Sequence, residues 1–218
     1  MTSVDLPLPG RYRGAVFDFD GLLVDSEPGW ARAEERLLQR HGHAMTDEDR
    51  TATVGRSMEQ SVATYAARLG MGPDGIVALH AELLELARRE YLAGFALRPG
   101  AVALLAHLRP AMPIGLASNT ERALIDLALA ATPLAALFDV VVTASDVNRH
   151  KPAPDLYLLA CERLGVSPAD AVAFEDSVAG IRSAHAAGLT VVAVAPAAGP
   201  AFELADVIVT SLEDLLPG

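Results

Sequence analysis

Four short apolar runs that end in polar residues restrict the fold of this 218-residue chain more than any other feature of its sequence. They are AVFDFDG (15–21), PIGLASNT (113–120), DVVVTASD (139–146) and AVAFEDS (171–177). Two further runs have the pattern of a strand without a reactive end, TVVAVA (190–195) and DVIVT (206–210). Helical patterns lie between the runs, at 100–109, 121–131, 154–165 and 178–188. Strands that alternate with helices predict an α/β protein with a doubly wound, Rossmann-like parallel sheet.

The polar ends of these runs predict the place of a functional site. Ligands of open parallel sheets bind outside the carboxyl ends of the strands, which is where the polar residues fall. Any one such end could simply cap the helix that follows it. Several of them in one chain favour a site built from neighbouring strand ends.

The interval between the first two strands is much longer than a crossover needs. Residues 21–112 separate them, whereas a parallel crossover requires only about a dozen residues. The interval contains three helical patterns and no convincing strand. We therefore expect an α/β core formed by residues 1–26 and 96–218, and an inserted all-α cap formed by residues 27–95. Because the insertion begins next to an acidic cluster, we expect it to cover the site as a lid rather than to be an ordinary surface insertion.

Composition and charge exclude several classes of protein. A hydrophobic fraction of 51% is enough for a packed core. The net charge of −11 argues against binding to nucleic acid or to an anionic membrane. Cys161 is the only cysteine, which rules out an intrachain disulfide. With no signal peptide and no membrane span expected, the sequence predicts a cytoplasmic protein, by default a monomer.

Four carboxylates are expected to meet at the ends of two strands. Asp18 and Asp20 close the first strand, and Glu175 and Asp176 close a later one. Two like charges about 4 Å apart repel by roughly 4 kcal/mol at an effective dielectric constant near 20. Such a cluster persists if a cation neutralises it or if a carboxyl group keeps its proton. Oxygen ligands without histidine or cysteine favour Mg²⁺ as that cation.

Polar and basic residues near the other strand ends could bind a phosphate. Lys151, in RHKPAPD, is the natural counter-charge to the acids. Ser118, Asn119 and Thr120 end the second strand and could donate hydrogen bonds to phosphate oxygens, although capping of the next helix would explain them almost as well.

Four segments in this order resemble the motifs of the haloacid dehalogenase-like hydrolases. The segments are DFDGLLVDSE, LASNT, KPAPD and FEDSVAGIRSAHAAG. The resemblance covers residues 14–216 and is greatest to the branch that contains phosphatases and β-phosphoglucomutases, which carries a helical cap between the first two motifs. It implies a Mg²⁺-dependent phosphatase that acts on a small phosphorylated metabolite, such as a sugar or polyol phosphate.

The resemblance also implies a role for each residue of the motifs. Asp18 would be the nucleophile that becomes an aspartyl phosphate, and Asp20 would be the general acid and then the general base. The Mg²⁺ ligands would be the Asp18 carboxylate, the Asp20 backbone carbonyl and Asp176, with Glu175 beside or behind the ion. The groups that hold the phosphoryl oxygens would be those of Ser118, Asn119 and Lys151.

Three alternative functions differ from this prediction in particular residues. Dehalogenases of this fold lack an acid at the position of Asp20. The presence of Asp20 therefore argues against dehalogenase activity. β-Phosphoglucomutases carry a histidine where Trp30 falls and a cap arginine where Met58 falls, so the sequence favours a phosphatase over a mutase. A non-enzymatic phospho-receiver domain has no large insertion after its first strand.

The specificity of the enzyme is expected to lie in the cap. Arg56, in VGRSMEQ, is a candidate contact for a sugar or polyol phosphate, although a solvated arginine explains it equally well. Trp30 could form an apolar wall of the pocket or part of the core of the cap.

Overall fold

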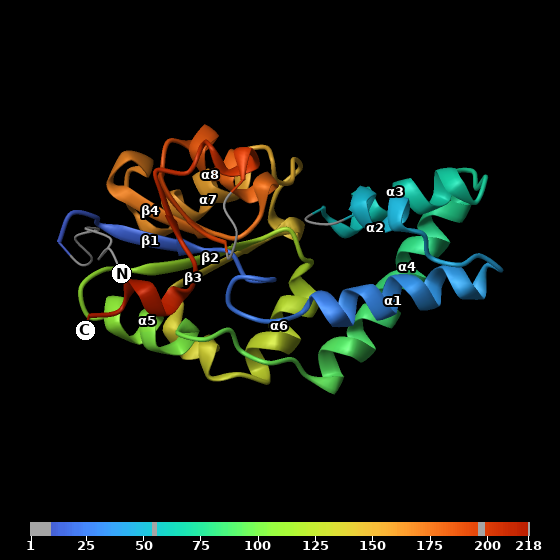
Figure 1. Ribbon diagram of the computed structural model, residues 1–218, viewed down its shortest axis with the longest axis horizontal. Coiled ribbons are helices and arrows are strands. Elements are labelled where there is room, and N and C mark those ends of the chain that lie inside the picture. The colour runs from blue at the N-terminus through green and yellow to red at the C-terminus, as the bar shows by residue number, and fades with distance from the viewer. Residues whose placement is uncertain (1–9, 54–55, 196–198, 218) are drawn as a thin grey trace.

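The computed structural model describes residues 10–53, 56–195 and 199–217 (Figure 1). Within these residues, six parallel strands form one sheet in the order β3–β2–β1–β4–β5–β6. Their bounds are β1 Gly14–Phe17, β2 Ile114–Ser118, β3 Val140–Thr143, β4 Ala171–Glu175, β5 Thr190–Val194 and β6 Val207–Val209. Every strand coincides with a run that the sequence predicts, except that β1 begins one residue earlier, at Gly14. The doubly wound α/β fold is confirmed.

The strand order determines where a ligand can bind. The chain builds outward from β1 in one direction through β2 and β3, and in the other through β4 to β6. Phe17 at the end of β1 pairs with Leu116 of β2 on one side and with Phe174 of β4 on the other. The order reverses between β1 and β4, and the crevice at such a switch point is the usual ligand site of this architecture.

Helices cover both faces of the sheet, with α7 and α8 on one face and α5 and α6 on the other (Figure 1). Their bounds are α5 Ala101–Leu108, α6 Arg122–Ala130, α7 Asp155–Leu164 and α8 Val178–Ala187. Short 3₁₀ helices complete this part of the chain, η1 Pro133–Leu137, η2 Ala144–Asp146, η3 Pro168–Asp170, η4 Pro200–Phe202 and η5 Leu212–Leu215.

Alternate residues of β1 serve the two faces of the sheet. Val16 packs with the cluster under α7 and α8, whereas Ala15 and Phe17 pack with the cluster under α5 and α6. Burial of both faces explains why the strands are apolar throughout rather than alternately polar.

Four helices, named here the helical insertion, lie between β1 and α5 on the side of the molecule away from the sheet (Figure 1). Their bounds are α1 Glu27–Arg40, α2 Asp47–Thr53, α3 Met58–Arg68 and α4 Pro73–Ala93. In the described residues from 27 to 93 there is no strand, as expected. The division of the chain at residues 26 and 96 into a core and a cap domain stays a prediction, because one continuous apolar cluster joins residues of both parts.

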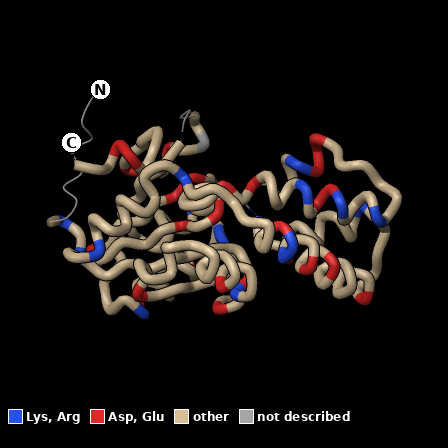
Figure 2. The backbone as a smooth tube through the Cα atoms, turned by 90° about the horizontal axis from the view of Figure 1, so that it is seen from below, with Lys and Arg blue, Asp and Glu red and all other residues tan. Residues whose placement is uncertain are grey.

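Helix α2 is the element that the sequence analysis missed. Its sequence, DEDRTAT, has no apolar residues at helical spacing, which is the signal on which helix prediction depends. Three acids in its first turn favour a helix start through the helix dipole instead. Figure 2 shows acidic and basic residues mixed along the whole helical insertion, which indicates a solvated surface. None of the helices in the described part of the chain is both long and apolar enough to cross a membrane.

The two chain segments that connect the insertion to the sheet lie side by side. The Asp25 N–H donates to the Ala96 carbonyl at 2.8 Å, and the Arg98 N–H donates to the Leu23 carbonyl at 2.9 Å. Val24 and Leu97 form an antiparallel bridge between these bonds. The insertion is therefore held to the end of β1 by a paired connection rather than by two independent linkers.

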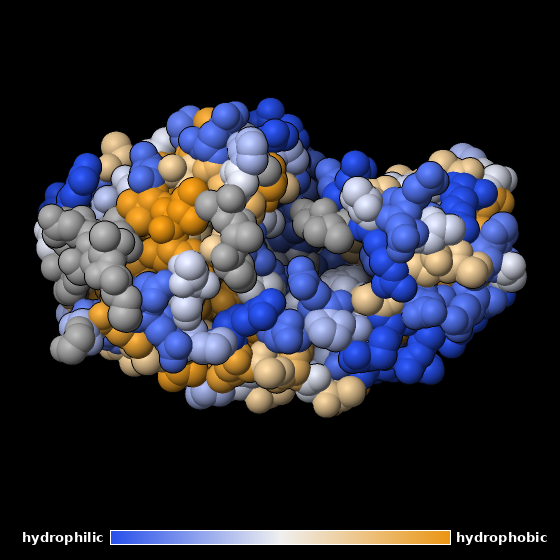
Figure 3. All heavy atoms as spheres, viewed as in Figure 1, coloured by the Kyte–Doolittle hydropathy of each residue, from blue (hydrophilic) through white to orange (hydrophobic). Residues whose placement is uncertain are grey.

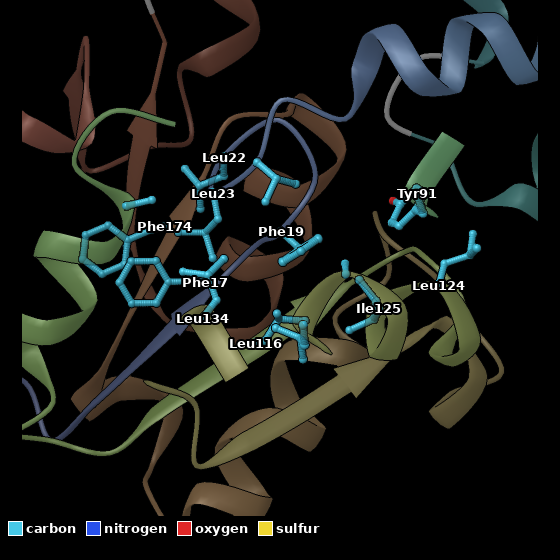
Figure 4. Packing of buried hydrophobic residues seen from close by; sticks show 14 of the residues in the cluster. Phe17, Phe19, Leu22, Leu23, Tyr91, Leu116, Leu124, Ile125, Leu134 and Phe174 are labelled. Carbon is cyan, nitrogen blue, oxygen red and sulfur yellow. The ribbon is translucent and has the colours of Figure 1, made fainter. Parts of the chain in front are cut away.

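The stacked pair of Phe17 and Phe174 predicts a large loss of stability on truncation. Their ring centroids are 4.3 Å apart at 11°, and both side chains are fully buried (Figure 4). We expect Phe174→Ala to lower the free energy of unfolding by about 3–5 kcal/mol, because it leaves a cavity between the strands and the helices. Chemical denaturation measures this change. Leu92→Ala, at a side chain that is 58% exposed, is the control and should change the value by less than about 0.5 kcal/mol. Equal effects of the two substitutions would contradict the packing described here.

Candidate active site

Asp18 directly follows β1, where three strand ends meet. Its N–H donates to the Phe174 carbonyl of β4 at 3.0 Å, which fixes the backbone at the carboxyl edge of the sheet. The Lys151 ammonium group donates to Asp18 Oδ1 at 2.6 Å and to the Ala117 carbonyl of β2 at 2.8 Å. Both side chains are buried. The structure therefore brings the predicted acid and its predicted counter-charge into direct contact.

Glu175, at the end of β4, shares the same lysine. Lys151 Nζ donates to Glu175 Oε1 at 2.6 Å, and the Tyr157 hydroxyl donates to this oxygen at 2.7 Å. The Ser177 hydroxyl donates to Oε2 at 3.1 Å. Glu175 is fully buried, and a Cβ at Gly180 would overlap its carboxylate. Both oxygens of Glu175 are thus occupied by protein groups.

Asp18, Glu175 and Asp176 form an acidic cluster in which one carboxylate oxygen from each lies within 4.8 Å of the others. Burial, only partly offset by Lys151, raises the pKa of Asp18 to about 7. Burial, followed by repulsion from Asp18 and Glu175, raises the pKa of Asp176 well above its usual range. For Lys151, burial lowers the pKa, but Asp18 and Glu175 outweigh this effect and raise it. One lysine therefore does not neutralise the three acids.

The cluster has the chemistry of a divalent-cation site. Asp176 Oδ1 is buried, and no group in the described part of the chain donates a hydrogen bond to it. A Cβ at Gly21 would overlap the Asp176 carboxylate, so glycine is required for the space around it. Carboxylate ligands favour Mg²⁺ or Ca²⁺ over softer metals. Asp18 and Asp176 fit the position of ligands better than Glu175, whose oxygens already accept hydrogen bonds from Lys151, Tyr157 and Ser177.

Asp20 lies apart from this cluster and is held by four hydroxyl groups. Ser26 and Tyr91 donate to its Oδ1 at 2.6 and 2.5 Å. Thr120 and Ser118 donate to its Oδ2 at 2.8 and 3.3 Å. The Asp20 side chain is therefore not grouped with the other three acids, and only its backbone carbonyl is left as the expected contact with a metal ion.

Ser118, at the end of β2, and the two residues after it connect the two sides of the site. Ser118 Oγ accepts the Thr120 N–H at 2.9 Å, in addition to its contact with Asp20. Asn119 Oδ1 accepts the Lys151 N–H at 2.8 Å, and its Nδ2 donates to the Lys151 carbonyl at 3.4 Å. These contacts place all the predicted phosphate-binding residues in one neighbourhood. Their role with a bound phosphate stays a prediction.

A cleft of about 560 Å³ separates the helical insertion from the loops at the sheet edge. Figure 3 shows the surface hollowed between these two parts of the molecule. Its lining includes Met58, His80, Asn119, Glu121 and His150. It is bridged by two pairs, His80–Glu121 at 2.7 Å and His150–Glu59 at 3.5 Å.

Arg56 stands at the margin of this cleft. It is exposed, and the lining begins with the next residue, Ser57. The structure thus does not group the Arg56 side chain with the residues that line the cleft, and its part in specificity stays a prediction.

Sequence analysis missed four residues whose side chains contact the acids, Ser26, Tyr91, Tyr157 and Ser177. Ser26 lies within the first motif, DFDGLLVDSE, and could have been suspected from its hydroxyl group. Tyr157 lies six residues after Lys151 in an ordinary helical pattern. Tyr91 is 71 residues from the acid that it contacts, and nothing in the local sequence marks it.

The sequence model of the family of haloacid dehalogenase-like hydrolases matches residues 12–188 of this chain. The chain belongs to this family, and it is a phosphoric monoester hydrolase.

Curated relatives and solved structures agree with the family. The chain is 37% identical to hexitol phosphatase A of Escherichia coli (strain K12) over 210 residues, which are 94% of each chain. It is 33% identical to fructose-1-phosphate phosphatase YqaB of the same strain, over 84% of this chain and 97% of that protein. The structure of CbbY from Rhodobacter sphaeroides in complex with phosphate is similar, with a TM-score of 0.81 and 27% identity over 94% of this chain and 96% of that one.

The shared lysine predicts that Lys151→Met destabilises the protein. Removing one partner of a buried ion pair costs about 3–5 kcal/mol, and here Asp18 and Glu175 both lose their cation. Chemical denaturation without divalent ions measures the loss. The control is Arg89→Met, which breaks an exposed pair with Glu85 and should cost less than about 1 kcal/mol. A fully stable Lys151→Met protein would contradict the buried pairing.

Proposed function

We propose that this protein is a Mg²⁺-dependent phosphatase that hydrolyses a sugar or polyol phosphate through an aspartyl phosphate at Asp18. The observation that carries the proposal is the buried contact of Lys151 with Asp18 and Glu175, next to an Asp176 oxygen that has no partner in the part of the chain that the structure describes. A site with a carboxylate nucleophile, a fixed cation and clustered carboxylate oxygens that could hold a second cation suits an anionic substrate with charge developing at phosphorus.

Asp18 is the nucleophile of this mechanism. Its carboxylate forms a bond to phosphorus while the bond from phosphorus to the leaving-group oxygen breaks. Asp20 gives its proton to that oxygen, so the product leaves as a neutral alcohol. A water molecule then attacks phosphorus, Asp20 takes a proton from it, and the Asp18 carboxylate leaves. Dividing the reaction in this way replaces one high barrier with two lower ones.

The other site residues orient the phosphoryl group and lower its charge. Lys151 supplies a fixed positive charge, and the Ser118 and Asn119 side chains are near enough to it to hold phosphoryl oxygens. Asp18, Asp176 and the Asp20 backbone carbonyl would hold Mg²⁺, which supplies further positive charge beside the phosphoryl group when bound.

The relatives support a sugar or polyol phosphate as the substrate. One is named for hexitol phosphates and another for fructose 1-phosphate. The cleft offers carboxylate, imidazole and amide groups from Glu121, His80 and Asn119, which suit the hydroxyl groups of such a molecule. Arg56 stays a proposed contact only for a substrate long enough to reach the margin of the cleft.

Removing divalent cations should abolish turnover and lower stability. We expect phosphate release to stop in EDTA and to return with MgCl₂, because the acidic cluster then regains a counter-charge. At a Mg²⁺ concentration 100 times Kd, binding should stabilise the fold by about 2.7 kcal/mol, measured as a rise in Tm. Asp176→Asn is the matched variant and should lose both the activity and the Mg²⁺-dependent rise. Turnover at full rate in the chelator would overturn the metal requirement.

Replacing the nucleophile should abolish catalysis without unfolding the protein. We expect Asp18→Asn to release phosphate at least about 10³-fold more slowly than the unmodified enzyme, because an amide does not attack phosphorus. The assay is phosphate release from a panel of sugar and polyol phosphates with MgCl₂, with circular dichroism to verify folding. Substantial residual turnover would mean that another group is the nucleophile.

The same panel separates the alternative functions. Conversion of β-glucose 1-phosphate to the 6-phosphate without free phosphate would identify a mutase instead. Stable phosphorylation by acetyl phosphate without turnover would identify a phospho-receiver protein. The tryptophan at position 30 and the methionine at position 58, where the mutases carry histidine and arginine, favour hydrolysis.

A further inference from the structure

A tyrosine of the helical insertion reaches the proposed general acid. The Tyr91 hydroxyl, near the end of α4, donates to Asp20 Oδ1 at 2.5 Å. The Tyr91 side chain is only 3% exposed, so water does not compete for this bond. None of the four sequence motifs includes this residue.

The direction of the bond is determined by Trp30. The Trp30 indole Nε1–H donates to the Tyr91 hydroxyl oxygen at 3.2 Å. An indole nitrogen can only donate, so the single proton of the tyrosine is directed to Asp20. Burial, together with the nearby Asp20 carboxylate, raises the pKa of Tyr91 well above its usual value, which keeps that proton in place. Trp30 therefore determines the direction in which the Tyr91 hydroxyl donates its proton.

An aromatic cluster fixes Tyr91 relative to the end of β1. The Tyr91 ring packs edge-on against Trp30, with centroids 6.0 Å apart, and against Phe95 at 5.5 Å. Phe95 in turn packs edge-on against Phe19 at 6.2 Å. Because Phe19 lies between Asp18 and Asp20 in the chain, the position of α4 is coupled directly to the two acids; Figure 4 shows Phe19 and Tyr91 brought together from distant segments.

We propose that Tyr91 is a positioning residue that orients Asp20 for proton transfer, with Trp30 orienting Tyr91. This inference rests on the proposed function. Tyr91 and Ser26 occupy Oδ1 of Asp20 with two donated hydrogen bonds. These two bonds restrict the rotation of the carboxyl group, while Thr120 and Ser118 donate to its other oxygen, Oδ2.

The importance of this orientation depends on the leaving group. When the phosphorus–oxygen bond of a hexitol phosphate breaks, its electron pair remains on an alkoxide-like oxygen that needs a proton from Asp20. The oxygen of p-nitrophenyl phosphate leaves as a stable phenolate and needs no proton. Misorientation of Asp20 should therefore slow the first substrate far more than the second.

The experiment compares kcat/KM of Tyr91→Phe for the two substrates with MgCl₂. This parameter reports the steps up to cleavage of the leaving group. Because general acid catalysis contributes roughly 10²–10⁴-fold, we expect a loss of about 10- to 100-fold for the hexitol phosphate. For p-nitrophenyl phosphate we expect a loss of less than about threefold, because that reaction does not use the proton. The loss should appear in kcat rather than in KM.

Two further variants separate positioning from stability. Tyr65→Phe removes the hydroxyl of another buried tyrosine of the insertion, which contacts Thr53 and not Asp20, and should affect the two substrates equally. Trp30→Phe keeps an aromatic ring and removes the indole donor, so it should reproduce the substrate dependence to a smaller extent. The Tm of each variant shows that it is folded.

Each outcome of this comparison has one meaning. Equal losses for both substrates in Tyr91→Phe, or no loss for either, would overturn the positioning role even if the enzyme is a phosphatase. If Tyr91→Phe does not fold, Trp30→Phe alone decides, and equal losses there overturn the proposal. Failure of the unmodified enzyme to hydrolyse either substrate would instead refute the proposed function.

Discussion

The structure depends on one buried ammonium group that is shared between two carboxylates from neighbouring strands. Lys151 contacts Asp18 after β1, Glu175 at the end of β4 and the Ala117 carbonyl in β2. Burying three ionised groups carries a high desolvation cost, which is repaid only when hydrogen bonds are complete. Tyr157 and the Asn119 side chain supply bonds of this kind, to Glu175 and to the Lys151 backbone. The lysine therefore holds the edge of the sheet together and sets the spacing of the site.

Even with this contact, the site has fewer positive charges than carboxyl groups. Three clustered acids have a single lysine beside them, which contacts two of them. Burial raises the pKa of Asp18 and Asp176, and one Asp176 oxygen has no partner among the described residues. A site in this condition gains stability when a cation binds, and the cation then attracts an anionic substrate. Unfavourable electrostatics in the free protein thus become binding energy in the complex. This is a common relation between stability and activity in enzymes.

The helical insertion contributes in a different way from the sheet. The sheet determines the relative positions of Asp18, Lys151 and Glu175. Two of the four donors to Asp20 lie where the chain enters and leaves the helical insertion, Ser26 directly before α1 and Tyr91 near the end of α4. Paired backbone bonds at these points keep the insertion in register with the end of β1. A helical insertion attached in this manner can influence the chemical step as well as the choice of substrate.

The sequence by itself determined the order of strands and helices, the insertion and the acids and lysine of the site, because apolar periodicity and polar strand ends are local patterns. It could not predict α2, whose residues have no apolar period, or that Arg56 does not belong to the lining of the cleft. Only the tertiary structure brought Tyr91 to Asp20 and Tyr157 to Glu175. These contacts join residues far apart in the chain, where a tyrosine in a helix has the same local pattern whether it is part of the core or holds a catalytic acid. Local sequence records which faces are buried, whereas packing alone decides which buried groups meet.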